Sequence, residues 1–93
     1  MRRAARTDSN QQAVIDRLRE ANFKVKYIKE PVDLLVAGIN PRTGRRTNVL
    51  MEVKVDGGRL TKQQVEFIAE WPGPLHIVKT GDEAVEIMVE ECK

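Results

Sequence analysis

The sequence predicts one α/β domain, covering residues 1–93, in which helices flank a mixed sheet of about four strands in the order αβββαβα. Three observations predict this fold class. Three segments have apolar residues at helical spacing behind a capping residue. Four short segments rich in Val, Ile or Leu are bounded by turn residues, as strands are. The 93 residues, 41% hydrophobic and 32% charged, suit a single compact domain.

The first helix is expected to be capped by Asp8 or Ser9 and to end near Ala21. Its apolar residues Val14, Leu18 and Ala21 share one stripe, which should face the core, and Ile15 lies beside them. Residues 1–7, ahead of this helix, are expected to form a flexible basic arm.

Three strands should follow the first helix. Residues 23–28 alternate apolar positions with Lys24 and Lys26, which is typical of an edge strand. The apolar runs 33–39 and 48–56 are expected to form the two arms of an antiparallel hairpin.

The loop of this hairpin predicts its register. Proline suits the first bend of a type I turn and glycine suits a left-handed exit, so residues 41–44 form a four-residue loop. Asn40 then faces Arg45, and Asp33 faces Glu52. A slip of one residue would turn Asp33 to the opposite face of the sheet.

A second helix is expected from its cap, Thr61, to about Glu70, where residues 71–74 (Trp-Pro-Gly-Pro) end it. Its expected inward residues are Val65, Ile68 and Ala69.

The chain should end with a short buried strand over 75–78 and a helix capped by Thr80. The face that this helix turns inward should contain Ala84, Val85 and Met88.

The tripeptide Glu52-Val53-Lys54 and the facing Asp33 are the strongest functional feature. Facing side chains lie about 5 Å apart at Cβ, and Lys54 points the same way as Glu52 because it is two residues further along the strand. Two carboxylates this close repel unless a cation lies between them. Mg²⁺ commonly takes one or two protein carboxylates, and the backbone carbonyl of Val53 is a candidate third ligand.

This set suits phosphodiester hydrolysis. Mg²⁺ or Mn²⁺ offsets the charge of the phosphate and lowers the pKa of a bound water. The ammonium of Lys54 would orient the attacking water or stabilise the phosphate as negative charge builds.

Asp33 followed by Glu52-Val53-Lys54 resembles the (P)D…(D/E)xK signature of the PD-(D/E)xK nuclease superfamily. Residues 5–85 are similar to one branch of it, the virus-type replication-repair nuclease (VRR-NUC) domains, and especially to small phage members. The segments that carry the resemblance are Ala5-Arg6-Thr7-Asp8-Ser9-Asn10-Gln11, Val32-Asp33-Leu34-Leu35-Val36, Leu50-Met51-Glu52-Val53-Lys54, Leu60-Thr61-Lys62-Gln63-Gln64 and the stretch around Trp71.

The resemblance implies a restriction-endonuclease-like fold with Mg²⁺ or Mn²⁺ bound by Asp33 and Glu52. It also implies a catalytic role for Lys54 and an auxiliary polar role for Gln64 beside them. Small phage members look like homodimeric endonucleases that cut branched DNA such as four-way junctions. A cytoplasmic location, in a bacterium or a phage-infected host cell, is implied as well.

Two departures from the family pattern stand out. The usual Pro-Asp pair is Val32-Asp33 here, with Pro31 one place early. The family often has a Glu in the first helix that assists the metal site, whereas Gln11 occupies that place here and an amide carries no charge.

Basic clusters suggest where DNA would bind. The net charge of +2 is too small to indicate nucleic acid, but arginines gather in the arm and at the hairpin tip. The candidates for DNA contact are Arg6, Arg42, Arg45 and Arg46. The alternative interpretation is that these are solvated loop charges.

Other residues also have plainer interpretations. A strand Glu-x-Lys is often a solvated charge pattern, Asp33 alone suits a strand entry, and Gln64 suits any polar helix position. His76 is interpreted as a satisfied core histidine, and Trp71 as core or interface packing, rather than a base-stacking platform. The alternative function is a catalytically weak or inactive nuclease-fold protein that serves as a DNA-binding or protein-interaction module.

The sequence predicts neither a membrane-spanning segment nor an intrachain disulfide. No stretch is long and apolar enough to span a membrane, and no signal peptide is visible. Cys92 is the single cysteine, so no intrachain disulfide can form.

Overall fold

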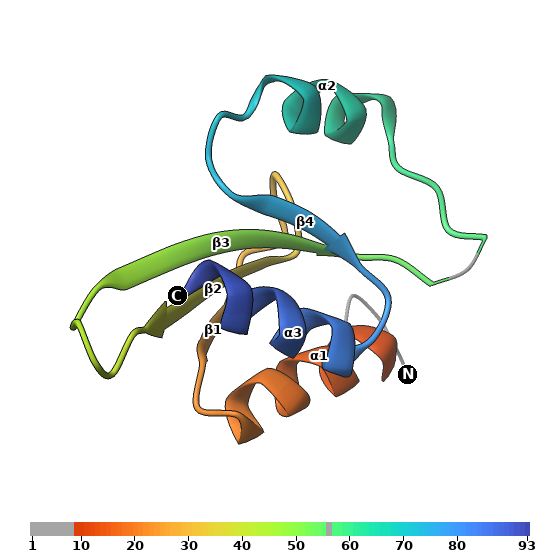
Figure 1. The fold of residues 1–93 in the computed structure, drawn as a ribbon. Coiled ribbons are helices and arrows are strands. Elements are labelled where there is room, and N and C mark those ends of the chain that lie inside the picture. The colour runs from red at the N-terminus through yellow and green to blue at the C-terminus, as the bar shows by residue number, and fades with distance from the viewer. Residues whose placement is uncertain (1–8, 56) are drawn as a thin grey trace.

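The elements follow the predicted αβββαβα order. The chain is described by a computed structural model over residues 9–55 and 57–93, so the basic arm, Arg6 and the candidate cap Asp8 lie outside the described residues. The elements are α1 (Ser9–Glu20), β1 (Lys24–Tyr27), β2 (Leu34–Ile39), β3 (Arg46–Val53), α2 (Lys62–Glu70), β4 (Leu75–Val78) and α3 (Gly81–Glu91). Figure 1 shows α1 and α3 together against one face of the sheet, and α2 by itself beyond the other face.

The sheet is mixed and its strands lie in the order β1-β2-β3-β4. The pairs β1–β2 and β2–β3 are antiparallel, whereas β3 and β4 are parallel. The prediction of a four-stranded mixed sheet flanked by helices is therefore confirmed. Because β4 is an edge strand, only Val78 of it is buried, and the expectation of a buried strand there was wrong.

The predicted hairpin register is confirmed. Leu34 lies opposite Met51, and the N–H of Asn40 donates to the carbonyl of Arg45 at 2.8 Å. Gly44 has a φ of +79°, the left-handed exit that favours glycine. The second arm differs in its bounds: β3 begins two residues before the expected position 48 and ends at Val53, short of 56.

The core lies between the sheet and the pair α1–α3. Alternate residues of the central strands point into it, because successive side chains of a strand face opposite sides. The buried apolar residues on this inner face and its helices include Val14, Ile15, Leu18, Leu34, Val36, Val49, Met51, Val53, Val78, Ala84 and Met88. Val55, which falls within the expected second arm at 48–56, lies past the end of β3 and is 53% exposed.

The expected inward face of α2 was wrong. Val65 and Ala69 are exposed, and no residue of α2 is buried. The helix face turned to the sheet contains Gln64 and Phe67 instead. Gln64 hydrogen-bonds to Glu52 of β3, and Phe67 lines a hollow together with strand residues on the outer face of the sheet. The rotation of α2 is set by these contacts, since no layer packs on its other side among the described residues.

None of the helices in the described part of the chain is long and apolar enough to span a membrane.

Gly38→Ala is expected to lower the free energy of unfolding by about 1–3 kcal/mol, because overpacking forces neighbouring atoms to move. A Cβ at Gly38 would lie 2.6 Å from Sγ of Cys92 and 2.9 Å from ring carbons of Phe23. Urea unfolding measures the loss. Adding Cys92→Ala should recover part of it, and a Gly38→Ala variant as stable as the wild type would contradict this packing.

Candidate active site

Asp33 and Glu52 are joined across the start of the hairpin, as the register predicts. The N–H of Asp33 donates to Oε1 of Glu52 at 3.1 Å, and the N–H of Val53 donates to Oδ2 of Asp33 at 2.9 Å. Both carboxylates point to the outer face of the sheet, towards α2. Only 9% of Asp33 and 2% of Glu52 is exposed.

The chain entering β2 holds Asp33 in place. The N–H groups of Ile28 and Lys29 both donate to the carbonyl of Asp33, at 2.8 and 3.2 Å. Lys29 adopts a φ of +71°, a left-handed conformation that a non-glycine residue adopts only when its surroundings require it. The loop between β1 and β2 therefore fixes the backbone position of Asp33.

Lys54 and Gln64 complete the site around Glu52. Nζ of Lys54 lies 3.3 Å from Oε2 of Glu52, and Nε2 of Gln64 donates to the same oxygen at 2.9 Å. The side chain of Lys54 is 27% exposed, so the ammonium is at the edge of the site, where a solvent-borne ligand can reach it. The four residues predicted as catalytic are thus brought together.

Gln64 is oriented by the start of its own helix. Its Oε1 accepts from the N–H of Thr61 at 3.0 Å, and its N–H donates to Oγ1 of Thr61 at 3.1 Å, which forms a capping box. One end of the amide therefore secures the helix start while the other end holds Glu52. This double use fixes the position of α2 relative to β3.

The pKa of Asp33 is raised to about 6. Burial is the main cause, and the N–H of Val53 opposes it; the negative charge of Glu52 raises the pKa further, and Lys54 lowers it. Two acids in one buried site thus cannot both be ionised at low cost. A divalent cation between them would remove that cost.

The donor set suits a hard cation such as Mg²⁺. Among the described residues, no group of three or more His, Cys, Asp or Glu side chains is placed to hold a metal ion, and Asp33 and Glu52 are the two carboxylates brought together here. Mg²⁺ commonly takes one or two carboxylates and keeps several waters. The N–H of Val53 points to Asp33, and the carbonyl of an extended residue faces the same neighbour as its N–H, so the Val53 carbonyl remains a candidate ligand.

Gln11, the residue in the place of the family's helix acid, lies half-buried in the first turn of α1. That helix covers the inner face of the sheet (Figure 1), whereas the Glu52 carboxylate is hydrogen-bonded to Gln64 of α2 on the outer face. A contribution of Gln11 to the site stays a prediction.

The arginines of the hairpin tip have different surroundings. Arg42 and Arg46 are exposed, and Arg46 is on the same face of β3 as Glu52. Arg45 is exposed too, but it also donates through one terminal nitrogen to the carbonyls of Glu91 and Lys93, at 2.9 and 2.6 Å. Its charge thus complements the carboxyl end of α3. Whether these arginines contact DNA stays a prediction.

His76 and Trp71 are less buried than expected. Nε2 of His76 lies 2.9 Å from Oε2 of Glu91, on the inner side of β4 and away from Glu52, so it has a partner but is not a core residue. Trp71 is 44% exposed and its ring stacks on Phe67, with 4.9 Å between ring centroids. The interpretation of Trp71 as core packing was therefore wrong, whereas interface packing stays a prediction.

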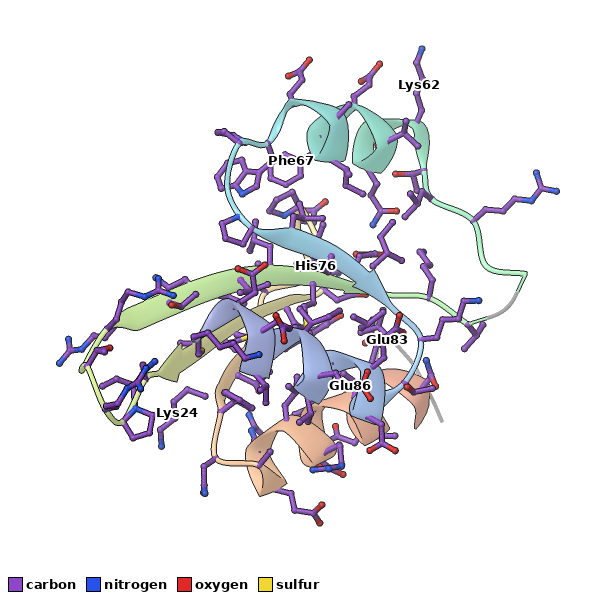
Figure 2. All side chains as sticks on the ribbon, in the orientation of Figure 1. Lys24, Lys62, Phe67, His76, Glu83 and Glu86 are labelled. Atoms are coloured by element: carbon purple, nitrogen blue, oxygen red, sulfur yellow. The ribbon has the colours of Figure 1, made fainter. Side chains whose placement is uncertain are left out.

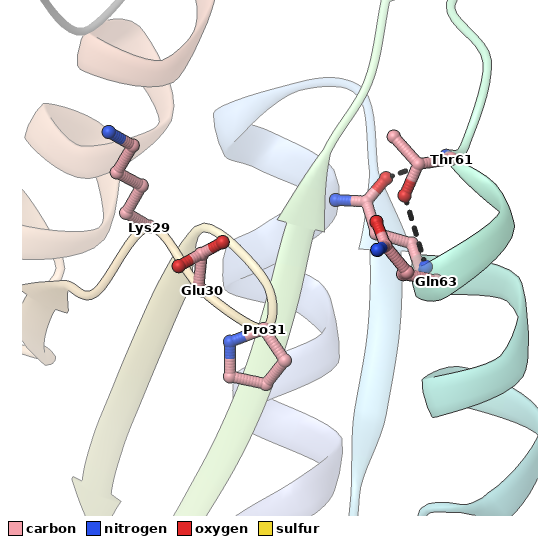
Figure 3. Close-up of a pocket in the computed structure, with 6 residues that line it drawn as sticks. Lys29, Glu30, Pro31, Thr61 and Gln63 are labelled. Atoms are coloured by element: carbon pink, nitrogen blue, oxygen red, sulfur yellow. Dashed lines mark hydrogen bonds between the residues drawn. The ribbon is translucent and has the colours of Figure 1, made fainter.

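A cleft beside the carboxylates was not anticipated. It measures about 610 Å³ and lies between the loop that enters β2 and the start of α2. Figure 3 shows Lys29, Glu30 and Pro31 on one side and Thr61 and Gln63 on the other. Gln64 lines the cleft and also donates to Glu52, so the cleft adjoins the site.

Comparison with protein-family models, curated proteins and solved structures finds no match.

Gln64→Ala is expected to reduce any metal-dependent cleavage by at least about 10-fold and stability by about 1 kcal/mol, since it removes both the bond to Glu52 and part of the cap. Thr61→Ala is the matched control, because it weakens the cap but leaves the Gln64 amide beside Glu52. Cleavage rates and urea unfolding compare the two. Equal cleavage by both variants would show that Gln64 acts only as a cap.

Proposed function

We propose that this protein is a Mg²⁺- or Mn²⁺-dependent DNA endonuclease of the PD-(D/E)xK type. Its α/β fold would then be a restriction-endonuclease-like fold. The observation that supports it most is the buried pair Asp33–Glu52, with Lys54 held 3.3 Å from one of its oxygens. A buried acid pair with a pKa raised to about 6 at Asp33 is costly to keep without a ligand. Acids with strongly shifted pKa values, beside a charge partner and next to a cleft, are typical of functional sites.

Each residue has a defined role in the proposed reaction. A divalent cation, when bound, offsets the phosphate charge and activates water for attack. Asp33 and Glu52 would hold that cation, and Gln64 keeps Glu52 in position. Lys54, at the exposed edge, would donate to the phosphate oxygens as negative charge develops on them.

The substrate and the assembly are proposed from the resemblance to small phage VRR-NUC domains. A homodimer presents two symmetry-related sites, which suits paired cuts across a four-way junction. Arg42 and Arg46, both exposed at the hairpin end, would contact the DNA backbone.

A cleavage assay tests the activity directly. The protein is incubated with labelled linear duplex, flap and four-way junction DNA in Mg²⁺, Mn²⁺ or EDTA. Cleavage is expected with either cation and not with EDTA, and most strongly on the branched substrates. Failure to cut any of these DNAs in Mn²⁺ would contradict the proposed activity.

One observation favours a second function. Within the described residues, the first turn of α1 contains no acid, so that turn supplies no carboxylate of the kind that often assists this type of metal site. A first turn without an acid is also what we expect of a nuclease-fold protein that has little or no activity and binds DNA or another protein. It predicts salt-dependent DNA binding without cleavage, or, for a protein-interaction module, no salt-dependent DNA affinity.

A further inference from the structure

The outer face of the sheet carries cations at the hairpin end, far from the carboxylates. Lys24 of β1 and Arg46 of β3 are exposed and line, with Asn48, a hollow of about 490 Å³. Because side chains alternate along a strand, Arg46, Asn48 and Leu50 lie on the same face of β3 as Glu52. The basic hollow and the candidate site are therefore on one surface.

An apolar hollow lies between them. It measures about 440 Å³, and Leu35 and Leu50 of the sheet line it together with Phe67 and Trp71. The exposed ring of Trp71 stacks on Phe67, which gives the hollow an aromatic wall that is reachable from solvent. Figure 2 shows Phe67 below α2, on the side turned to the sheet.

The three hollows adjoin one another. Pro31 lines both the cleft beside Gln64 and the apolar hollow, and Asn48 lines both the apolar and the basic hollow. We call the joined hollows the trough. The six residue steps from Arg46 to Glu52 along β3 span about 20 Å.

We propose that the trough binds an unpaired segment of the DNA strand next to the cut site, with a base against Trp71 and phosphates beside Lys24 and Arg46. This inference rests on the proposed nuclease function and adds the substrate class. Groups that bind single strands combine cations along the backbone with aromatic rings under the bases. Base pairs of a duplex keep their faces stacked inside the helix, so a duplex would leave the apolar section unfilled.

The charges of the trough agree with this orientation. Lys29 and Glu30 both line the end near the carboxylates, so their charges offset each other there. Lys24 and Arg46 give the other end its positive charge. The strand would thus be drawn across the apolar hollow from the basic end towards the site.

Binding in EDTA tests this proposal separately from cleavage. Labelled oligothymidine is titrated with protein while anisotropy and the emission of Trp71, the single tryptophan, are followed. Binding should quench that emission. Trp71→Ala should bind at least about 10-fold more weakly, and Trp71→Phe should retain most of the affinity because its ring can still stack. The double variant Lys24→Gln/Arg46→Gln should lower the salt slope by about 1.4.

Lys62→Gln is the matched control, because Lys62 points away from the sheet (Figure 2). This variant should bind oligothymidine as the wild type does. Unchanged affinity and salt slope in the double variant, or unquenched Trp71 on binding, would overturn the proposal. So would a Trp71→Ala variant that changes oligomeric state but not oligothymidine binding, since the face would then join copies of the chain. A protein that binds in this way but never cuts DNA would contradict only the nuclease function.

Discussion

Asp33→Asn is expected to abolish metal-dependent cleavage and at the same time to stabilise the metal-free protein at pH 8. The substitution removes one of the two carboxylates that would hold the cation. It also removes a charge that is costly to bury, while the amide oxygen can still accept from the N–H of Val53. The expected gain in the free energy of unfolding is on the order of 2 kcal/mol at pH 8.

The pH dependence of this gain has a definite sign. The pKa of Asp33 is about 6 in the folded protein and 3.8 for the ordinary group. The folded state therefore binds the proton more tightly, so the contribution of Asp33 to stability is fully present below about pH 4 and is lost as the pH rises through about 6. The variant and the wild type should be equally stable near pH 4 and should diverge above it. Urea unfolding in EDTA measures the difference, and a variant less stable than the wild type at pH 8 would contradict the buried charge conflict.

Lys54→Met is expected to lower cleavage by about 10²–10³-fold while leaving the cation bound, since it removes a donor to the developing phosphate charge. Its effect on stability should have the opposite sign to that of Asp33→Asn. Glu52 is 2% exposed and would lose its cationic partner at 3.3 Å, which should cost about 1–3 kcal/mol in the metal-free protein. Cleavage rates, Mn²⁺ titration and urea unfolding measure the three effects.

Lys62→Met controls for the loss of a lysine, because Lys62 is an exposed residue of α2 that points away from the sheet (Figure 2). It should leave both cleavage and stability close to those of the wild type. If Lys54→Met cut DNA as fast as this control, Lys54 would have no part in the reaction. Loss of Mn²⁺ binding in Lys54→Met would instead show that Lys54 holds the carboxylate pair in position to bind the cation.

The sequence predicted the hairpin well because local chemistry determines its register. A loop with Pro41 and Gly44 allows few geometries, and that geometry leaves Asp33 facing Glu52 without reference to the rest of the fold. The placement of Gln64 was predicted only through the family resemblance. Its physical basis, the capping box with Thr61, is visible in the sequence as Thr-x-x-Gln before a helical segment.

Other features depend on contacts between distant segments and were missed. The rotation of α2 follows from one hydrogen bond to Glu52 and from the ring of Phe67, whereas helical spacing alone favoured the face with Val65. The contact of the exposed Arg45 with the end of α3 was missed, because nothing in the sequence shows that this end lies beside the hairpin loop. The cleft near Lys29 likewise forms between two segments that meet only in the folded chain.

Calorimetric titration of the wild type and Asp33→Asn with Mn²⁺, at pH 6 and pH 8 in buffers of different ionisation enthalpy, tests the cation site most directly. With a pKa of about 6 at Asp33, binding to the wild type should release about half a proton at pH 6 and almost none at pH 8. Asp33→Asn should show no comparable binding. A wild type that binds no Mn²⁺, or an Asp33→Asn variant that binds it equally well, would contradict the assignment of Asp33 and Glu52 as the ligands.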